Sequence, residues 1–120
     1  MSKQALVVKA ELTAEMIDIA EQELSKLQGA VDGLIQPVDL SPTITMWVNE
    51  EGLLRDDLNI HPLATLFMEE LGSQTPIFGD VVFTGGSDED GNTLGLTQEI
   101  VNELSEMTRR AKEYLEQATA

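Results

Sequence analysis

The sequence predicts an α+β fold, with a small mixed or antiparallel sheet, three helices and a long C-terminal helix. Three observations predict this class. Apolar residues recur at steps of three and four in two segments, a third segment is bounded by a proline and a glycine at helix-start and helix-stop positions, and the stretches between them are rich in β-branched residues. With 120 residues and 42% hydrophobic content, residues 1–120 are expected to form a single domain with its own core.

The N-terminal third predicts a strand, a helix and an irregular strand. Residues 5–8 form a short apolar run, which indicates a strand. Residues 14–28 are expected to be helical, with Thr13 as the N-cap and Gly29 as the stop. Residues 31–40 predict an edge-like extended segment, because a glycine and a proline interrupt it. The apolar face of the expected helix comprises Ile17, Ala20, Leu24 and Leu27.

The middle of the chain predicts a strand, a helix and a hairpin. Residues 43–48 alternate in polarity and are rich in β-branched and aromatic side chains, which indicates a strand. Residues 62–71 predict a second helix, since they begin with proline and are followed by glycine. Residues 76–84 are expected to form another strand, with a Gly-Asp interruption. An Asp-Gly turn within residues 87–92 would lead into a return strand at 93–96.

The last helix is expected from about Thr97, its N-cap, to about Glu116. Its apolar residues are spaced four and three apart, which is a heptad pattern. A helix of this length spans roughly 30 Å. We expect its first three turns to cover the sheet, and the last two turns are left open to a partner subunit. The seam that would serve a homodimer comprises Ile100, Leu104, Met107, Ala111 and Tyr114.

Charge is distributed very unevenly along the chain. Between Lys26 and Arg109 there is one basic residue, Arg55, against fifteen acidic residues. Direct binding to nucleic acid or to an anionic membrane needs clustered Lys and Arg, so neither partner is expected. The chain has no cysteine, which excludes disulfides and thiolate metal sites. Neither a signal peptide nor a membrane span is visible, so a cytoplasmic protein is expected, in the host cytoplasm if a phage encodes it.

The residues that usually carry chemistry do not form a catalytic pattern. His61 is the only histidine and cannot make a multi-histidine zinc site. An EF-hand register on residues 88–92 would place Gly86 and Thr97 at ligand positions one and twelve, where neither fits. No nucleophile-elbow spacing occurs. We therefore expect no catalytic residue, no metal and no cofactor, and the protein is not expected to be an enzyme.

Several short motifs carry a resemblance to a family. The segments are Leu24 to Gly33, Trp47-Val48-Asn49-Glu50-Glu51-Gly52, Asn59 with Pro62, Ala64 and Thr65, Pro76 to Gly85 and Gly95-Leu96-Thr97, with Asn49, Gly52, Asn59, Gly79 and Asp80 as the motif residues. Together they resemble an uncharacterised family of small acidic proteins found in phages, plasmids and bacterial genomes, especially of actinobacteria. The resemblance covers about residues 5–97 and departs at residues 29–33, where the family more often has paired glycines followed by an aromatic residue. It implies a mobile-element accessory protein without an assigned activity.

Paired carboxylates supply the candidate partner-binding surface. A group of acidic side chains around the second helix would create one anionic field, which steers basic partners by long-range attraction. The first hypothesis is an accessory protein that binds a basic, nucleic-acid-binding host protein, with DNA mimicry as its mode of inhibition. The alternative is a structural or regulatory module that dimerises through the C-terminal helix, with acidity serving solubility only. The six acids are Glu50, Glu51, Asp56, Asp57, Glu69 and Glu70.

Overall fold

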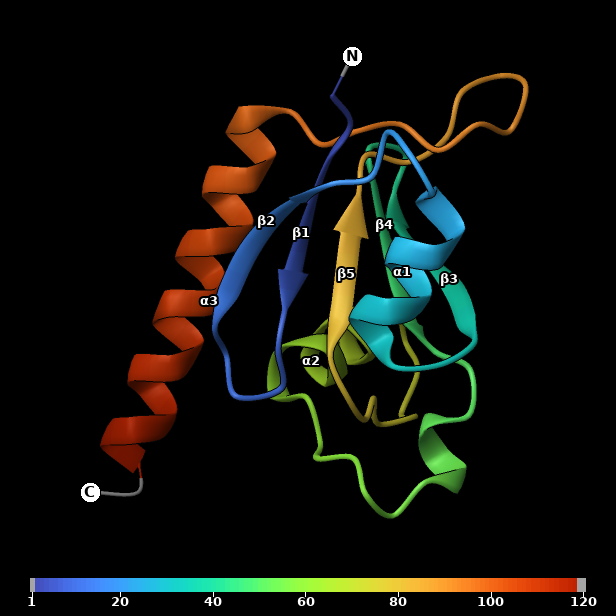
Figure 1. The fold of residues 1–120 in the computed structure, drawn as a ribbon. Coiled ribbons are helices and arrows are strands. Elements are labelled where there is room, and N and C mark those ends of the chain that lie inside the picture. Colours follow the sequence, from blue (N-terminus) through green and yellow to red (C-terminus); the bar gives the residue numbers. More distant parts are fainter. Residues whose placement is uncertain (1, 119–120) are drawn as a thin grey trace.

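A computed structural model describes residues 2–118 and shows a five-stranded antiparallel sheet with helices on both of its faces (Figure 1). The strand order is β2-β1-β5-β4-β3, and every neighbouring pair is antiparallel. The α+β fold with three helices and a long C-terminal helix is therefore confirmed, and the sheet is antiparallel rather than mixed. The strands are β1 (Gln4–Val8), β2 (Ala14–Asp18), β3 (Ile35–Ser41), β4 (Ile44–Asn49) and β5 (Val81–Thr84). The helices are α1 (Glu23–Val31), α2 (Pro62–Glu70) and α3 (Gln98–Ala118), with a 3-10 turn, η1 (Gly52–Leu54).

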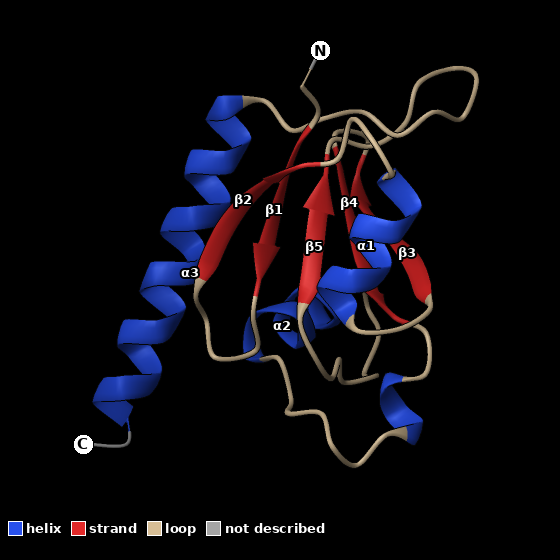
Figure 2. Ribbon diagram, in the orientation of Figure 1, coloured by secondary structure: helices blue, strands red, loops and turns tan. Residues whose placement is uncertain are grey.

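Strands β1 and β5 lie in the interior of the sheet, with helices around it (Figure 2). Their side chains are buried on both faces, which explains why their sequences are continuous apolar runs. Successive side chains of a strand point to opposite faces. Ala5 and Val7 therefore pack with Leu27 of α1 on one face, and Leu6 packs with Leu104 of α3 on the other. Helix α2 also packs on that second face. The rings of Phe67 on α2 and Phe83 on β5 lie edge to face, with their centroids 6.0 Å apart.

The prediction of a helix over residues 14–28 is wrong for its first half. Ala14–Asp18 forms the edge strand β2, so Thr13 caps no helix, and α1 begins only at Glu23. The apolar side chains of Ile17 and Ile19 are two residues apart and both pack toward α1, which is a strand periodicity. Leu24, placed on the buried face of the expected helix, is exposed instead.

The end of α1 also differs from the expectation. Gly29 lies inside the helix, which ends when Asp32 adopts a left-handed conformation at φ 59°. The amide of Gly33 then donates to the carbonyl of Gln28 at 3.1 Å, which satisfies one of the last helical carbonyls. The strand expected over residues 31–40 consequently starts only at Ile35.

Two other extended segments are shorter than the sequence indicates. The strand expected over residues 76–84 contains only Val81–Thr84, because Gly79 has a φ of 92° and ends the regular pairing. Residues 93–96 do not form a return strand; Ser87 and Thr93 make one isolated bridge, and the amide of Leu96 donates to the carbonyl of Gln4. The remaining elements, β1, β4, α2 and α3, lie within two residues of their expected bounds.

Candidate protein-binding surfaces

The Asn-Glu-Glu-Gly motif holds the end of α1 against the end of β4. The side-chain amide of Asn49 is buried, donates to the carbonyl of Val31 at 3.0 Å and to that of Asp32 at 3.3 Å, and accepts from the amide of Glu51 at 2.8 Å. A Cβ at Gly52 would lie 3.1 Å from the carbonyl oxygen of Phe78. Asn49 and Gly52 therefore shape a turn, and the glutamates between them remain exposed.

The other motif residues form a second turn at the same end of the sheet. The carbonyl of Asn59 accepts from the amide of Gly79 at 2.8 Å, so the backbone of Asn59 makes this contact while its side chain is exposed. Asp80 accepts from the amide of Ala10 at 2.9 Å, which joins the β1–β2 turn to the segment before β5. These contacts give Asn59, Gly79 and Asp80 structural roles.

His61 is fully buried at the start of α2. Its Nδ1 accepts from the amide of Ala64 at 3.1 Å, so its Nε2 carries the proton and donates to the carbonyl of Val8 at 2.9 Å. Burial away from water lowers the pKa of His61, although its bond to Val8 and the charge of Asp80 oppose that shift. The ring is therefore neutral at pH 7, and it acts as a helix N-cap.

Arg55 partly neutralises the acidic loop, residues 50–57, which carries Glu50, Glu51, Asp56 and Asp57. Its guanidinium lies 2.9 Å from the carboxylate of Asp32 and 2.6 Å from that of Asp57, and it also donates to the carbonyl of Asp32. Hydrogen bonds from Arg55 lower the pKa of Asp57, and the bonds that Arg55 donates to Asp57 and Asp32 raise its own pKa. One of the six candidate acids is therefore compensated.

The six candidate acids are all exposed, but they lie on more than one local surface. Glu50, Glu51, Asp56 and Asp57 surround η1 and the loop after it. Glu69 lies at the end of α2 and lines a groove against α3. Within residues 2–118, no Lys, Arg or His forms an ion pair with any of the six except Asp57. The five unpaired acids are Glu50, Glu51, Asp56, Glu69 and Glu70.

In the turn at residues 88–92, the carboxylate of Asp88 is bonded within the turn itself. Asp88 accepts from the amides of Asp90 and Asn92, each at 2.9 Å, and from the side-chain amide of Asn92 at 3.2 Å. The bonds from Asn92 lower the pKa of Asp88. Across the described part of the chain, no cluster of three or more His, Cys, Asp or Glu side chains is arranged to hold a metal ion.

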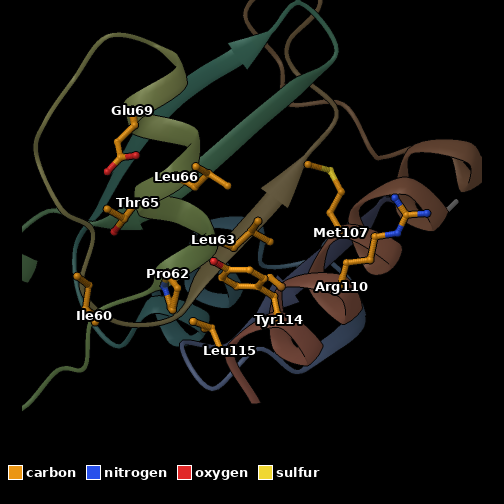
Figure 3. A pocket seen from close by; sticks show the side chains of 11 residues that line it. Ile60, Pro62, Leu63, Thr65, Leu66, Glu69, Met107, Arg110, Tyr114 and Leu115 are labelled. Carbon is orange, nitrogen blue, oxygen red and sulfur yellow. The ribbon is translucent and has the colours of Figure 1, made fainter. Parts of the chain in front are cut away.

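An apolar groove of about 530 Å³ separates α2 from the C-terminal half of α3 (Figure 3). Tyr114 reaches from α3 toward Pro62 and Leu63 at the start of α2, and Glu69 and Arg110 lie on opposite sides of the groove. Tyr114 is nevertheless 72% exposed. The groove is lined by Ile60, Pro62, Leu63, Thr65, Leu66, Glu69, Met107, Arg110, Ala111, Tyr114 and Leu115.

The groove divides the heptad seam into two parts. Ile100 and Leu104 pack into the core against the sheet, as expected for the first turns of the helix. Met107, Ala111 and Tyr114 line the groove instead. Sequence reasoning missed the α2 side of this surface, and the signal for it was a set of apolar residues at helical spacing on the expected second helix, Leu63 and Leu66.

The basic residues of α3 lie next to the groove. Arg109 pairs with Glu106 and, at 2.6 Å, with Glu113, and the Nε of Arg110 donates to Glu106 at 3.1 Å. Hydrogen bonds from Arg109 and Arg110 lower the pKa of Glu106 to about 2. Lys112 is exposed further along the same helix.

A second cleft, of about 660 Å³, lies between α1 and the strands β1 and β2. Its walls carry both signs of charge, from Lys9 and Lys26 and from Glu15 and Asp18. The Nζ of Lys26 donates to the carbonyl of Asp18 at 2.6 Å, and backbone amides of Lys3 and Ala20 lower the pKa of the Asp18 carboxyl. Lys26 and Asp18 are thus both bonded to backbone groups.

Comparison with known families places the chain. Residues 1–109 match the family described as Domain of unknown function (DUF3846), and the chain belongs to this family. No curated protein and no solved structure matches the chain. Among residues 2–118, no helix combines the length and apolar character that crossing a membrane requires.

Proposed function

We propose that this protein is a non-enzymatic accessory protein of phage or mobile-element type, which binds a basic host protein in the host cytoplasm through its acidic surface. The observation that carries the proposal is the state of the acids between Lys26 and Arg109. None of the fifteen is buried, and Arg55 is the only basic residue in that stretch. Within residues 2–118, only Asp32, Asp57 and Glu106 among these fifteen acids form ion pairs, so the surface presents a large uncompensated negative charge to a partner.

The acidic loop around η1 is the part of this surface best suited to a basic groove. Glu50, Glu51 and Asp56 are exposed and carry no ion pair, and the backbone turn that holds Glu50 and Glu51 is fixed by the buried amide of Asn49. A fixed backbone loses little conformational freedom when a partner binds. Duplex DNA presents one charge per roughly 1.7 Å of its axis, so closely spaced carboxylates can occupy a groove built for phosphates. Inhibition by DNA mimicry is the mode of action we propose.

Two measurements test this function. The tagged protein would first capture partners from host lysate at low and at moderate salt, with mass spectrometry to identify them. We expect a nucleic-acid-binding protein that is retained at low salt and released at higher salt, because exposed charges are screened within about 10 Å at 0.1 M salt. The purified partner would then be titrated with DNA and with this protein, which should compete for one site.

A matched pair of variants distinguishes the contribution of the loop to binding from that of the net charge. The loop variant carries Glu50→Gln, Glu51→Gln and Asp56→Asn, and the control carries Glu89→Gln, Asp90→Asn and Glu103→Gln, which removes the same charge from other exposed positions. We expect the loop variant to lose at least tenfold in affinity and the control to lose much less. Equal affinities for both variants and for the wild type would rule out the acidic surface as the binding site.

The groove between α2 and α3 favours a second candidate function. In this alternative the protein is a structural or regulatory interaction module, and its acidity serves solubility only. The supporting observation is the set of apolar side chains left exposed on one surface, Leu66, Met107 and Tyr114 among them. Under this alternative the loop variant would bind its partner with unchanged affinity, whereas Tyr114→Ala would weaken binding.

A further inference from the structure

The groove between α2 and α3 leaves apolar side chains exposed to solvent. Its two walls are apolar, with Pro62, Leu63 and Leu66 on α2 and Met107 and Tyr114 on α3. Leu66 is 47% exposed and Met107 is 40% exposed, although both lie beside side chains of the core. Apolar side chains that are gathered on one surface and remain open to water mark a site for another molecule.

The two walls carry opposite charges. Helix α2 contains Glu69 and Glu70 and no basic residue. On α3 the charged residue that lines the groove is Arg110, whereas Arg109 is paired with Glu106 and Glu113. Arg110 bonds to Glu106 through Nε only, and its side chain is 74% exposed, so most of its guanidinium is available to a further carboxylate.

This arrangement is complementary to itself. In a dimer with a two-fold axis, each contact occurs twice, and Arg110 of one copy can face Glu69 of the other at both places. A chain with a formal net charge of −15 repels its own copies over most of its surface. At the groove, a contact between Arg110 of one copy and Glu69 of the other would offset part of that repulsion.

We propose that the groove is covered by a second copy of this chain, in a two-fold dimer in which the end of α3 from each copy packs on α2 of the other. Tyr114 enters the groove of the second copy, and Arg110 faces Glu69 of that copy. This interface differs from the heptad seam expected from the sequence, because Ile100 and Leu104 are packed inside each copy. The inference is independent of the acidic-surface function, since it concerns α2 and α3 and not the loop at η1.

Molar mass in solution gives the first test. Light scattering coupled to gel filtration should give about twice the chain mass of 13.1 kDa for the wild type at micromolar concentration. Tyr114→Glu should give a monomer, because it places a charge in the apolar part of the interface. Circular dichroism should show unchanged folding, since Tyr114 is mostly exposed.

A charge exchange between copies gives the decisive test. Glu69→Arg alone places arginine opposite Arg110, and Arg110→Glu alone places glutamate opposite Glu69, so each variant should be monomeric. When the two variants are mixed, the arginine introduced into one copy meets the glutamate introduced into the other. The second contact keeps the native pair of Arg110 with Glu69, so the mixture should give a dimer. An effect confined to the fold of one chain would not be repaired by mixing.

The outcomes are distinct. A dimer that survives all three substitutions would overturn the proposed interface. A wild type that is monomeric throughout the micromolar range would overturn the second copy as the occupant, and tight binding of an apolar peptide to that monomer would assign the groove to a different partner. Neither result would alter the expected competition with DNA at the acidic loop.

Discussion

The ring of His61 joins the start of α2 to the end of β1, with its Nε2 2.9 Å from the carbonyl oxygen of Val8. Burial lowers the pKa of His61. At mildly acidic pH, the imidazole of the unfolded chain is therefore protonated to a greater extent than that of the folded chain. Stability must therefore fall as the pH drops through the unfolded pKa of about 6.5. We expect the wild type to lose unfolding free energy between pH 7.5 and pH 5.5 through this group, by at most about 1.4 kcal/mol, the free energy of one pKa unit.

The contribution of His61 can be isolated by His61→Asn. Asparagine can still cap α2, but it does not titrate. Urea unfolding at both pH values should show the loss in the wild type and not in the variant. Hydrogen bonds from their arginines lower the pKa values of Asp57 and Glu106, so these carboxyls remain ionised in this window and contribute to both proteins equally. Equal pH responses of the two proteins would show that His61 is protonated in the folded state as readily as in the unfolded one.

Asn49 is expected to contribute more to stability than Asn59, although both belong to the family motifs. Asn49→Ala leaves the carbonyl of Val31 and the amide of Glu51 without their partner in a buried turn. An unsatisfied buried group costs about 1–3 kcal/mol, so a loss in this range is expected. Asn59→Ala should change stability by less than about 0.5 kcal/mol, because the exposed side chain of Asn59 is not what bonds to Gly79. Chemical denaturation of both variants measures the difference, and equal losses would contradict the structural role of Asn49.

The contrast between β4 and β2 shows what a single sequence can predict. In β4 the alternation and the β-branched residues agree, and the strand lies one residue from its expected bounds. Around β2 the residues Ile17, Ala20, Leu24 and Leu27 fit a helical face by coincidence, while the pair Ile17 and Ile19 carries the strand period. The antiparallel pairing with β1 decides between them, and pairing partners cannot be read from a local pattern.

The candidate surfaces show the same limit. The exposed acids could be predicted, because charged side chains are rarely buried. The compensation of Asp57 by Arg55 also follows from near neighbours, but the second partner of Arg55, Asp32, lies on the turn after α1. The groove could not be predicted, since it exists only because α2 and α3 cover the same face of the sheet.

Two glycines are expected to respond in opposite directions to alanine. Gly29 lies inside α1, and a Cβ there would meet nothing within 4 Å. Gly29→Ala should therefore stabilise the protein by roughly 0.5–1 kcal/mol through the higher helix propensity of alanine. At Gly85 a Cβ would overlap the carbonyl oxygen of Gly95, where the segment after the turn at residues 88–92 crosses the end of β5. Gly85→Ala should destabilise the protein by more than about 2 kcal/mol, because backbone must move. Thermal melts of both variants provide the comparison, and a destabilising Gly29→Ala would show that the open space beside α1 is filled in solution.

Salt is expected to stabilise the folded protein. A formal net charge of −15 repels itself more strongly in the compact state than in the expanded unfolded chain. Raising sodium chloride from about 0.05 M to 0.5 M shortens the screening length below roughly 5 Å and weakens this repulsion. We expect the melting temperature to rise by a few degrees, which corresponds to about 1 kcal/mol for a domain of this size.

The loop variant with Glu50, Glu51 and Asp56 neutralised supplies the control for the salt response. Three of the unpaired acids are removed, so its melting temperature at low salt should already exceed that of the wild type, and its rise with salt should be smaller. The ion pairs of Arg55 with Asp32 and of Arg109 with Glu113 act in the opposite sense, because screening weakens them. A wild-type melting temperature that falls with salt would mean that these few pairs outweigh the repulsion among all the exposed acids. The acidic surface would then be internally compensated, and it would attract a basic partner only weakly.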